Sequence, residues 1–148
     1  MSPRIACLAL ASALALAAGA ARAQPPTSDC PQPRFTGKAP DEYLARTNPL
    51  PAGTDVAEAE RIFRGGRGVS CATCHGVKGD GRGEMASMFD PRPRNFQCAQ
   101  TVTGIPDGQL FWIIRNGSPD TAMPGYKKLS DRSIWRIILY LRTLSKPK

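Results

Sequence analysis

One five-residue stretch, Cys71-Ala72-Thr73-Cys74-His75, constrains this chain more than any other feature. Two cysteines separated by two residues and followed directly by a histidine are typical of a covalent haem attachment site. Each cysteine can add to one vinyl group of a porphyrin, and the histidine can then ligate the iron from one face. A porphyrin buries a large apolar area, so a short chain can build its core around it with few apolar residues of its own.

Two other kinds of site use closely spaced cysteines. A structural zinc site needs a second pair of ligands at matching spacing, and a redox-active dithiol follows a strand in a β-α-β pattern. The sequence contains neither pattern. The stretch Cys71 to His75 therefore favours a haem site.

The first 23 residues have the pattern of a secretory signal peptide. A short positive start, Met1 to Arg4, precedes an Ala/Leu-rich apolar run and the cleavage site Ala21-Arg22-Ala23. The alternative is an uncleaved membrane anchor, but the run is shorter than the roughly 20 apolar residues that a spanning helix needs. We therefore expect export to the periplasm and no membrane span after cleavage.

The rest of the chain divides into an arm and a haem domain. Residues 24–53 contain seven prolines, at positions 25, 26, 31, 33, 40, 49 and 51, and predict an extended arm. Residues 54–148 form the expected domain. Cys30 and Cys98 are left over after haem attachment, and in an oxidising compartment they favour a disulfide between arm and domain, with two free thiols as the alternative.

The charge balance indicates the kind of partner. Cleavage removes Arg4 and Arg22 from the 20 basic residues, which leaves 18 against 12 acidic residues and a net charge of +6. In an exported protein this charge favours redox partners with acidic docking faces rather than nucleic acid. The alternative is that the charge serves only solubility.

Periodic apolar positions predict three helices and no strand. The first spans Asp55 to Arg64, with Asp55 as its cap and Glu58 closing a capping box. The second spans residues 107–116, capped by Asp107 and ended by Gly117.

The third predicted helix begins at Ser130 or Asp131 and ends near Ser145. It has a wide apolar face, and we expect its arginines at 132, 136 and 142 to lie on a solvated face instead. Between the first two helices the chain is loop-like, with a short helical turn expected around residues 84–88.

The single histidine of the whole chain decides the ligand question. His75 belongs to the motif, so ligation by two histidines is excluded and only one haem can be held in this way. Methionine is the usual alternative ligand, and it raises the reduction potential. Met85 and Met88 follow His75 too closely to reach the other face, so we expect them to be ordinary packing residues, and Met123 is the predicted second ligand.

A ligating histidine also needs an acceptor for its other ring nitrogen. We expect that acceptor to be a carbonyl in the segment Pro91 to Pro93. Arg92 and Arg94 are candidates to pair with haem propionates.

Over roughly Thr54 to Leu144 the sequence resembles a class I monohaem cytochrome c. The resemblance rests on Phe63 in the first helix, the Cys71 to His75 motif, the loop 121–124 around Met123, and the aromatic residues Trp135 and Tyr140 in the last helix. It implies an all-α fold of three to four helices and long loops wrapped around one covalently bound haem c. Residues 79–83 and 91–96 are similar to bacterial periplasmic cytochromes c that serve dehydrogenases, reductases and terminal oxidases.

Together these patterns predict a periplasmic one-electron carrier, not itself an enzyme, that is monomeric or transiently complexed. Haem c is bound by Cys71 and Cys74, and His75 and Met123 ligate the iron. Basic residues steer the encounter with partners, the candidates being Lys78, Arg82, Lys127 and Lys128. Two alternatives stay open: a haem subunit of a larger oxidoreductase complex, and a haem-based sensor or small enzyme with an open sixth site.

Overall fold

The structure is a computed structural model that describes Cys30, Gln32 and residues 36–145. The expected signal peptide lies outside the described residues. Within the described part the chain is helical and contains no β-strand, only isolated bridges between Arg64 and Ser70 and between Gly117 and Pro124. This confirms the expected all-α class. None of the helices in that part is long and apolar enough to cross a membrane.

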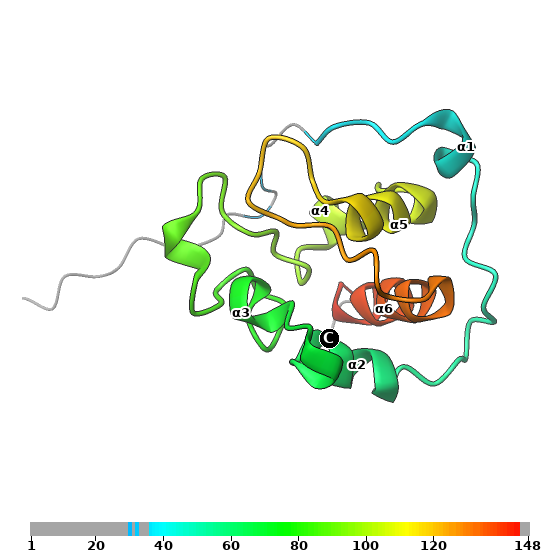
Figure 1. Ribbon diagram of the computed structural model, residues 1–148, viewed down its shortest axis with the longest axis horizontal. Helices are drawn as coiled ribbons and strands as arrows, with labels where there is room; N and C mark the ends of the chain where they lie inside the picture. The colour runs from blue at the N-terminus through cyan, green and yellow to red at the C-terminus, as the bar shows by residue number, and fades with distance from the viewer. Residues whose placement is uncertain (1–29, 31, 33–35, 146–148) are drawn as a thin grey trace, which may run out of the picture.

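Three longer helices form the body of the molecule (Figure 1): α2 (Ala57–Phe63), α5 (Asp107–Asn116) and α6 (Asp131–Leu144). The turn α1 (Asp41–Leu44) precedes α2, and four short turns lie between α2 and α5: η1 (Gly66–Gly68), α3 (Ala72–His75), η2 (Ala86–Met88) and α4 (Ala99–Val102). Helix α5 has the predicted bounds. Helix α6 begins at Asp131, one of the two predicted starts, and the Ser130 hydroxyl caps its first turn by accepting the Ser133 N–H at 3.2 Å.

Helix α2 begins two residues later than predicted. The Asp55 carboxylate accepts the Ala57 N–H at 2.8 Å, but Glu58 does not close a capping box. Its carboxylate is instead ion-paired with Arg136 of α6. The capping-box prediction is therefore wrong, because a partner on a packed neighbouring helix competes for the same carboxylate.

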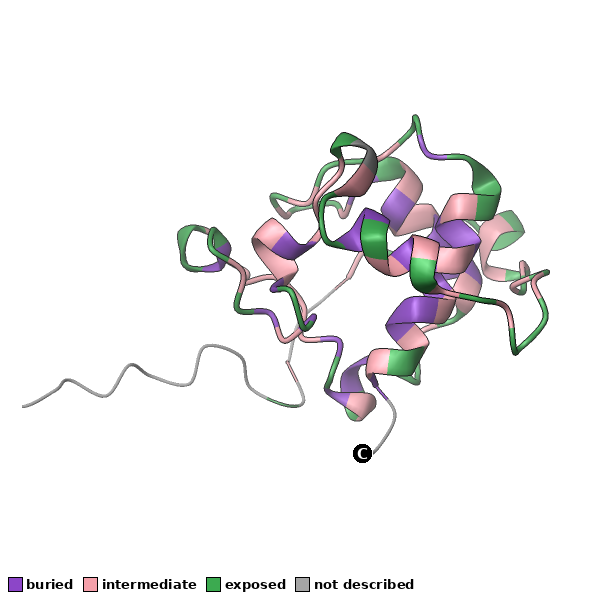
Figure 2. Cartoon of the chain, turned by 90° about the horizontal axis from the view of Figure 1, so that it is seen from below, coloured by how far each residue is buried: buried purple, intermediate pink, exposed green. Residues whose placement is uncertain are grey.

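The core lies where α2 and α5 pack against α6. Phe63 of α2 meets Tyr140 of α6 edge to face at 5.4 Å between ring centroids, and Phe111 of α5 lies 4.4 Å from Trp135. Figure 2 shows the buried residues concentrated on the helices and the exposed residues concentrated on the loops. Aromatic contacts of this kind add to the stability gained from buried area.

Two arginines of α6 depart from the predicted solvated face. Arg136 is paired with Glu58, and the Arg142 guanidinium donates to Asp107 at 2.7 Å and to the carbonyls of Val102 and Ile105. Asp107 therefore does not cap α5 as predicted. A guanidinium on a long stem can reach past the edge of an apolar face to polar groups on the neighbouring element.

The arm is not uniformly extended as predicted. Pro40 directly precedes one helical turn, α1. The N–H that proline lacks would have no partner within the helix at this position, so its absence does not weaken the turn. This turn lies against α5, because Gly108 has no side chain: a Cβ there would lie 1.7 Å from the Tyr43 carbonyl oxygen. In Figure 1 the arm runs along one edge of the molecule to α1 and then down to α2.

Candidate haem-binding site

The Cys-x-x-Cys-His motif forms the single turn α3. The His75 N–H donates to the Cys71 carbonyl at 2.8 Å, and the glycine-rich loop that follows folds back onto the turn. Gly81 N–H donates to the His75 carbonyl at 2.8 Å and Gly83 N–H to the Cys74 carbonyl at 3.1 Å. These bonds hold the two thiols and the imidazole in one rigid unit, and all three side chains are half-buried.

The His75 ring is held on two sides. Its Nδ1 lies 2.9 Å from the Arg94 carbonyl oxygen, and its face stacks on Phe96 at 4.5 Å between centroids. With the carbonyl as acceptor, Nδ1 carries the proton and Nε2 carries the lone pair that can ligate a metal. The predicted acceptor segment, Pro91 to Pro93, is therefore wrong by one residue: the carbonyl that faces His75 is that of Arg94.

All four predicted site residues, Cys71, Cys74, His75 and Met123, line one cleft. Its unfilled space, including the open mouth, is about 1090 Å³. The walls are mainly apolar, with side chains from all three longer helices and from residue 105: Phe63, Ile105, Leu110, Ile113, Ile114, Ile137 and Leu141.

Met123 comes from the loop between α5 and α6, and local bonds hold this loop in place. Its N–H donates to Thr121 Oγ1 at 3.2 Å, its carbonyl accepts the Ser118 N–H at 3.2 Å, and the Tyr126 N–H donates to the Ile114 carbonyl at 2.9 Å. Gly117, with φ of 92°, turns the chain sharply out of α5. A Cβ there would meet the Met123 carbonyl oxygen at 2.8 Å.

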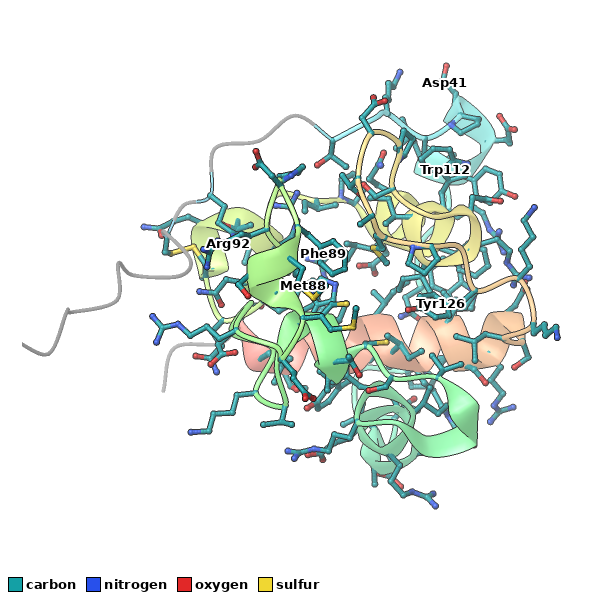
Figure 3. All side chains as sticks on the ribbon, turned by 60° about the vertical axis from the view of Figure 1, so that its left-hand side comes forward. Asp41, Met88, Phe89, Arg92, Trp112 and Tyr126 are labelled. Carbon is teal, nitrogen blue, oxygen red and sulfur yellow. A yellow bond between two sulfur atoms is a disulfide. The ribbon has the colours of Figure 1, made fainter. Side chains whose placement is uncertain are left out.

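The other two methionines lie elsewhere. Met85 is 36% exposed and Met88, labelled in Figure 3, is 71% exposed, and neither lines the cleft. The expectation that they are packing residues is therefore wrong, because Met88 in η2 and Met85 directly before it lie on the surface rather than against the core.

The electrostatics of the cleft keep its thiols neutral. Burial, with a smaller contribution from Cys74, raises the pKa of Cys71 to about 11, and burial also raises the pKa of Cys74. Zinc binding and thiol exchange both use thiolates, which this environment disfavours. Within the described residues no group of three or more His, Cys, Asp and Glu side chains is arranged to hold a metal ion. Two neutral thiols, an oriented imidazole and an apolar cleft fit a haem.

Several residues of the cleft were missed by the sequence analysis. Thr36 of the arm lines it, as do Phe89 and Tyr126, which are labelled in Figure 3. Burial raises the pKa of the Tyr126 hydroxyl to about 12. Tyr126 lies three residues after Met123 and could have been inferred from that spacing, whereas nothing in the sequence pointed to Thr36.

An all-α fold whose core surrounds such a cleft is that of a c-type cytochrome. The sequence model of the family described as cytochrome c oxidase, cbb3-type, subunit III matches residues 54–141. The chain therefore belongs to this family of c-type cytochromes. Membership implies a covalently bound haem c and electron transfer through it.

Among solved structures, a chain of the Kuenenia stuttgartiensis reducing HAO-like protein complex is similar in fold, with a TM-score of 0.53 and 24% sequence identity. The match covers 66% of this chain and 50% of that chain, so the present chain spans about half the length of the matched one. A comparison with curated proteins finds no match.

Proposed function

We propose that this chain is a periplasmic one-electron carrier in which Cys71 and Cys74 would hold one haem c by thioether bonds and His75 and Met123 would ligate its iron. The observation that carries the proposal is that these four side chains, from two elements 48 residues apart in sequence, line the same apolar cleft. The haem supplies the chemistry, an iron that accepts and returns one electron.

The chain's own residues set the properties of the site. The Arg94 carbonyl and the Phe96 ring fix the orientation of the His75 ring, so the imidazole does not need to reorient in order to ligate iron. A thioether ligand from Met123 favours the reduced state and raises the reduction potential. The apolar walls would limit the access of water to a bound haem. Because His75 and Met123 are each held by local hydrogen bonds, the protein would keep both iron ligands in place in either oxidation state.

Partner docking is expected to be electrostatic and transient. Four exposed cations, Lys78, Arg82, Lys127 and Lys128, follow the haem motif or the Met123 loop in sequence. Such charges raise the association rate with an acidic partner more than they raise affinity. The interface would be small, on the order of 1,200 Å² or less. The reaction rate with an acidic partner should therefore fall as ionic strength rises.

The proposed export is supported by a pair of cysteines. The sulfur atoms of Cys30 and Cys98 lie at bonding distance, with their Cα atoms 5.6 Å apart. We propose that they form a disulfide between arm and domain, which requires an oxidising compartment.

A second function is favoured by the comparisons: a haem subunit bound permanently to a larger oxidoreductase. The matched family is described as an oxidase subunit, and the similar solved structure is a protein complex. Gel filtration of the native extract separates the two functions. Elution at the size of the single chain supports the free carrier, and coelution with a larger redox protein supports the subunit.

The ligand assignment is tested by Met123→Ala, with Met88→Ala as the matched control on the exposed methionine. We expect the first variant to keep its covalent haem but to lose the low-spin ferric spectrum, and the second to keep both. An unchanged spectrum for Met123→Ala would show that another group ligates the iron.

A further inference from the structure

Gln32 of the arm binds the backbone on both sides of Arg94. Its side-chain Oε1 accepts the Asn95 N–H at 2.8 Å, and its Nε2 donates to the Pro93 carbonyl at 3.4 Å. The peptide carbonyl between these two groups, that of Arg94, is the acceptor for His75 Nδ1. One amide side chain thus contacts the peptide group that carries the carbonyl facing the histidine, through the N–H of that same group, and also the preceding peptide group.

The same arm also contacts the Arg94 side chain. Arg94 Nη2 donates to Thr36 Oγ1 at 2.8 Å, and Thr36 itself lines the cleft. Two residues before Gln32, Cys30 lies against Cys98, three residues after Asn95. The arm therefore contacts residues 93–98 in three ways: through the backbone of residues 93 and 95, through the Arg94 side chain and through the sulfur atom of Cys98.

The segment needs such support because it has no regular secondary structure. Residues 92–95 belong to no helix or strand, so no repeating hydrogen bonds set the direction of their carbonyls. Directly after this segment, the Phe96 N–H donates to the Gly79 carbonyl at 2.7 Å. Within the segment, Gln32 supplies hydrogen bonds to the backbone of Pro93 and Asn95.

We propose that Gln32 is a positioning residue for His75: by fixing the peptides on either side of Arg94, it directs the Arg94 carbonyl at Nδ1 of the ligating imidazole. This inference rests on the proposed function, because it concerns His75 as an iron ligand. A hydrogen bond from Nδ1 to a carbonyl raises the basicity of the imidazole. A more basic ligand stabilises ferric iron, so weakening this bond should raise the reduction potential.

The test is Gln32→Met in the intact haem protein, since methionine keeps the length of the side chain and removes both hydrogen bonds. Gln109 offers a matched control. Its amide also joins two backbone groups of the arm, accepting the Ala39 N–H at 2.8 Å and donating to the Gly37 carbonyl at 2.9 Å, and it does not contact residues 93–95. Gln109→Met therefore loosens the arm without touching the Arg94 carbonyl.

Reduction potentials are measured by redox titration of both variants and of the unsubstituted protein. Removal of the hydrogen-bond partner of a metal ligand typically changes metal affinity 10–100-fold. Gln32→Met keeps the Arg94 carbonyl and only loosens it, so we expect a smaller effect, a rise of about threefold in the ferrous-to-ferric ratio. At 59 mV per tenfold change for one electron, this is a rise of about 30 mV. Gln109→Met should leave the potential unchanged.

A second variant separates positioning from general loosening. In Gln32→Glu the carboxylate still accepts the Asn95 N–H, and its negative charge favours ferric iron, so the potential should stay level or fall. If Gln32→Met does not accumulate, Gln32→Asn, which shortens the side chain by one methylene, should give a smaller rise.

Equal potentials for Gln32→Met and Gln109→Met would overturn the inference, and so would a rise in Gln32→Glu or no shift in Gln32→Asn. Failure of the proposed function would look different. It would be seen in the unsubstituted protein, as a ferric spectrum that is not low-spin.

Discussion

Replacing Arg142 with methionine should destabilise the fold more than any other single change among the basic residues of α6. The guanidinium joins α6 to Asp107, the first residue of α5, at 2.7 Å, and to the carbonyls of Val102 and Ile105 just before that helix. Methionine keeps the apolar stem of the side chain and removes these bonds. The carboxylate and both carbonyls then lose a charged donor.

The magnitude follows from the number of bonds and their exposure. Hydrogen bonds to a charged group contribute about 1.5–3 kcal/mol each, and breaking a buried ion pair costs about 3–5 kcal/mol. The Arg142 and Asp107 side chains are 26% and 27% exposed, so water can replace part of what is lost. We therefore expect a loss of about 2–4 kcal/mol in the free energy of unfolding.

Urea unfolding of the haem protein, followed by circular dichroism, measures this loss. Arg132→Met is the matched control, because Arg132 lies on the same helix and is exposed. A surface change of this kind stays within about 0.5 kcal/mol. Thermal unfolding should agree, since 1 kcal/mol corresponds to roughly 4–8 °C for a domain of this size. Equal stabilities for the two variants would refute the reasoning that Arg142 joins α6 to α5.

Two further predictions concern the cysteines. A thiol count on the unfolded, exported haem protein should find no free thiol, because the proposed haem attachment uses Cys71 and Cys74 and the proposed disulfide uses Cys30 and Cys98; two free thiols would remove the disulfide. In the folded protein without haem, maleimide labelling of Cys71 should be slow at pH 8 and should rise up to about pH 11, because burial raises its pKa to about 11 from 9.0. Since the folded state favours the neutral thiol, the corresponding contribution to stability is complete below the unfolded pKa and is lost as the pH rises through the folded one. Full reactivity of Cys71 already at pH 9 would contradict the burial of this thiol.

The elements predicted from the sequence are those with local causes. Helix α5 ends at Gly117 and α6 begins after Ser130, as expected, because a glycine stop and a serine cap act on adjacent residues. Glu58 and Asp107 were assigned to local caps and instead pair with Arg136 and Arg142. Tertiary partners compete for the same carboxylates, and single-sequence patterns do not show which contact is preferred.

The same distinction applies to the site. The motif itself and the need for a carbonyl acceptor at His75 could be predicted, because both follow from the chemistry of a ligating imidazole. Which carbonyl accepts was missed by one residue, and the contributions of Gln32 and Thr36 were missed entirely. Their contacts with the Arg94 segment join residues 58 to 63 positions apart, so nothing in the sequence pattern marks them.

The proposed function requires that His75 and Met123 both ligate the iron of one haem. The absorption spectrum of the oxidised protein tests it most directly, because a sulfur bond to ferric haem gives a weak band at the red end of the spectrum. We expect a low-spin spectrum with this band. A high-spin spectrum without it would mean that the sixth position is open, and would contradict the account of this chain as an electron carrier.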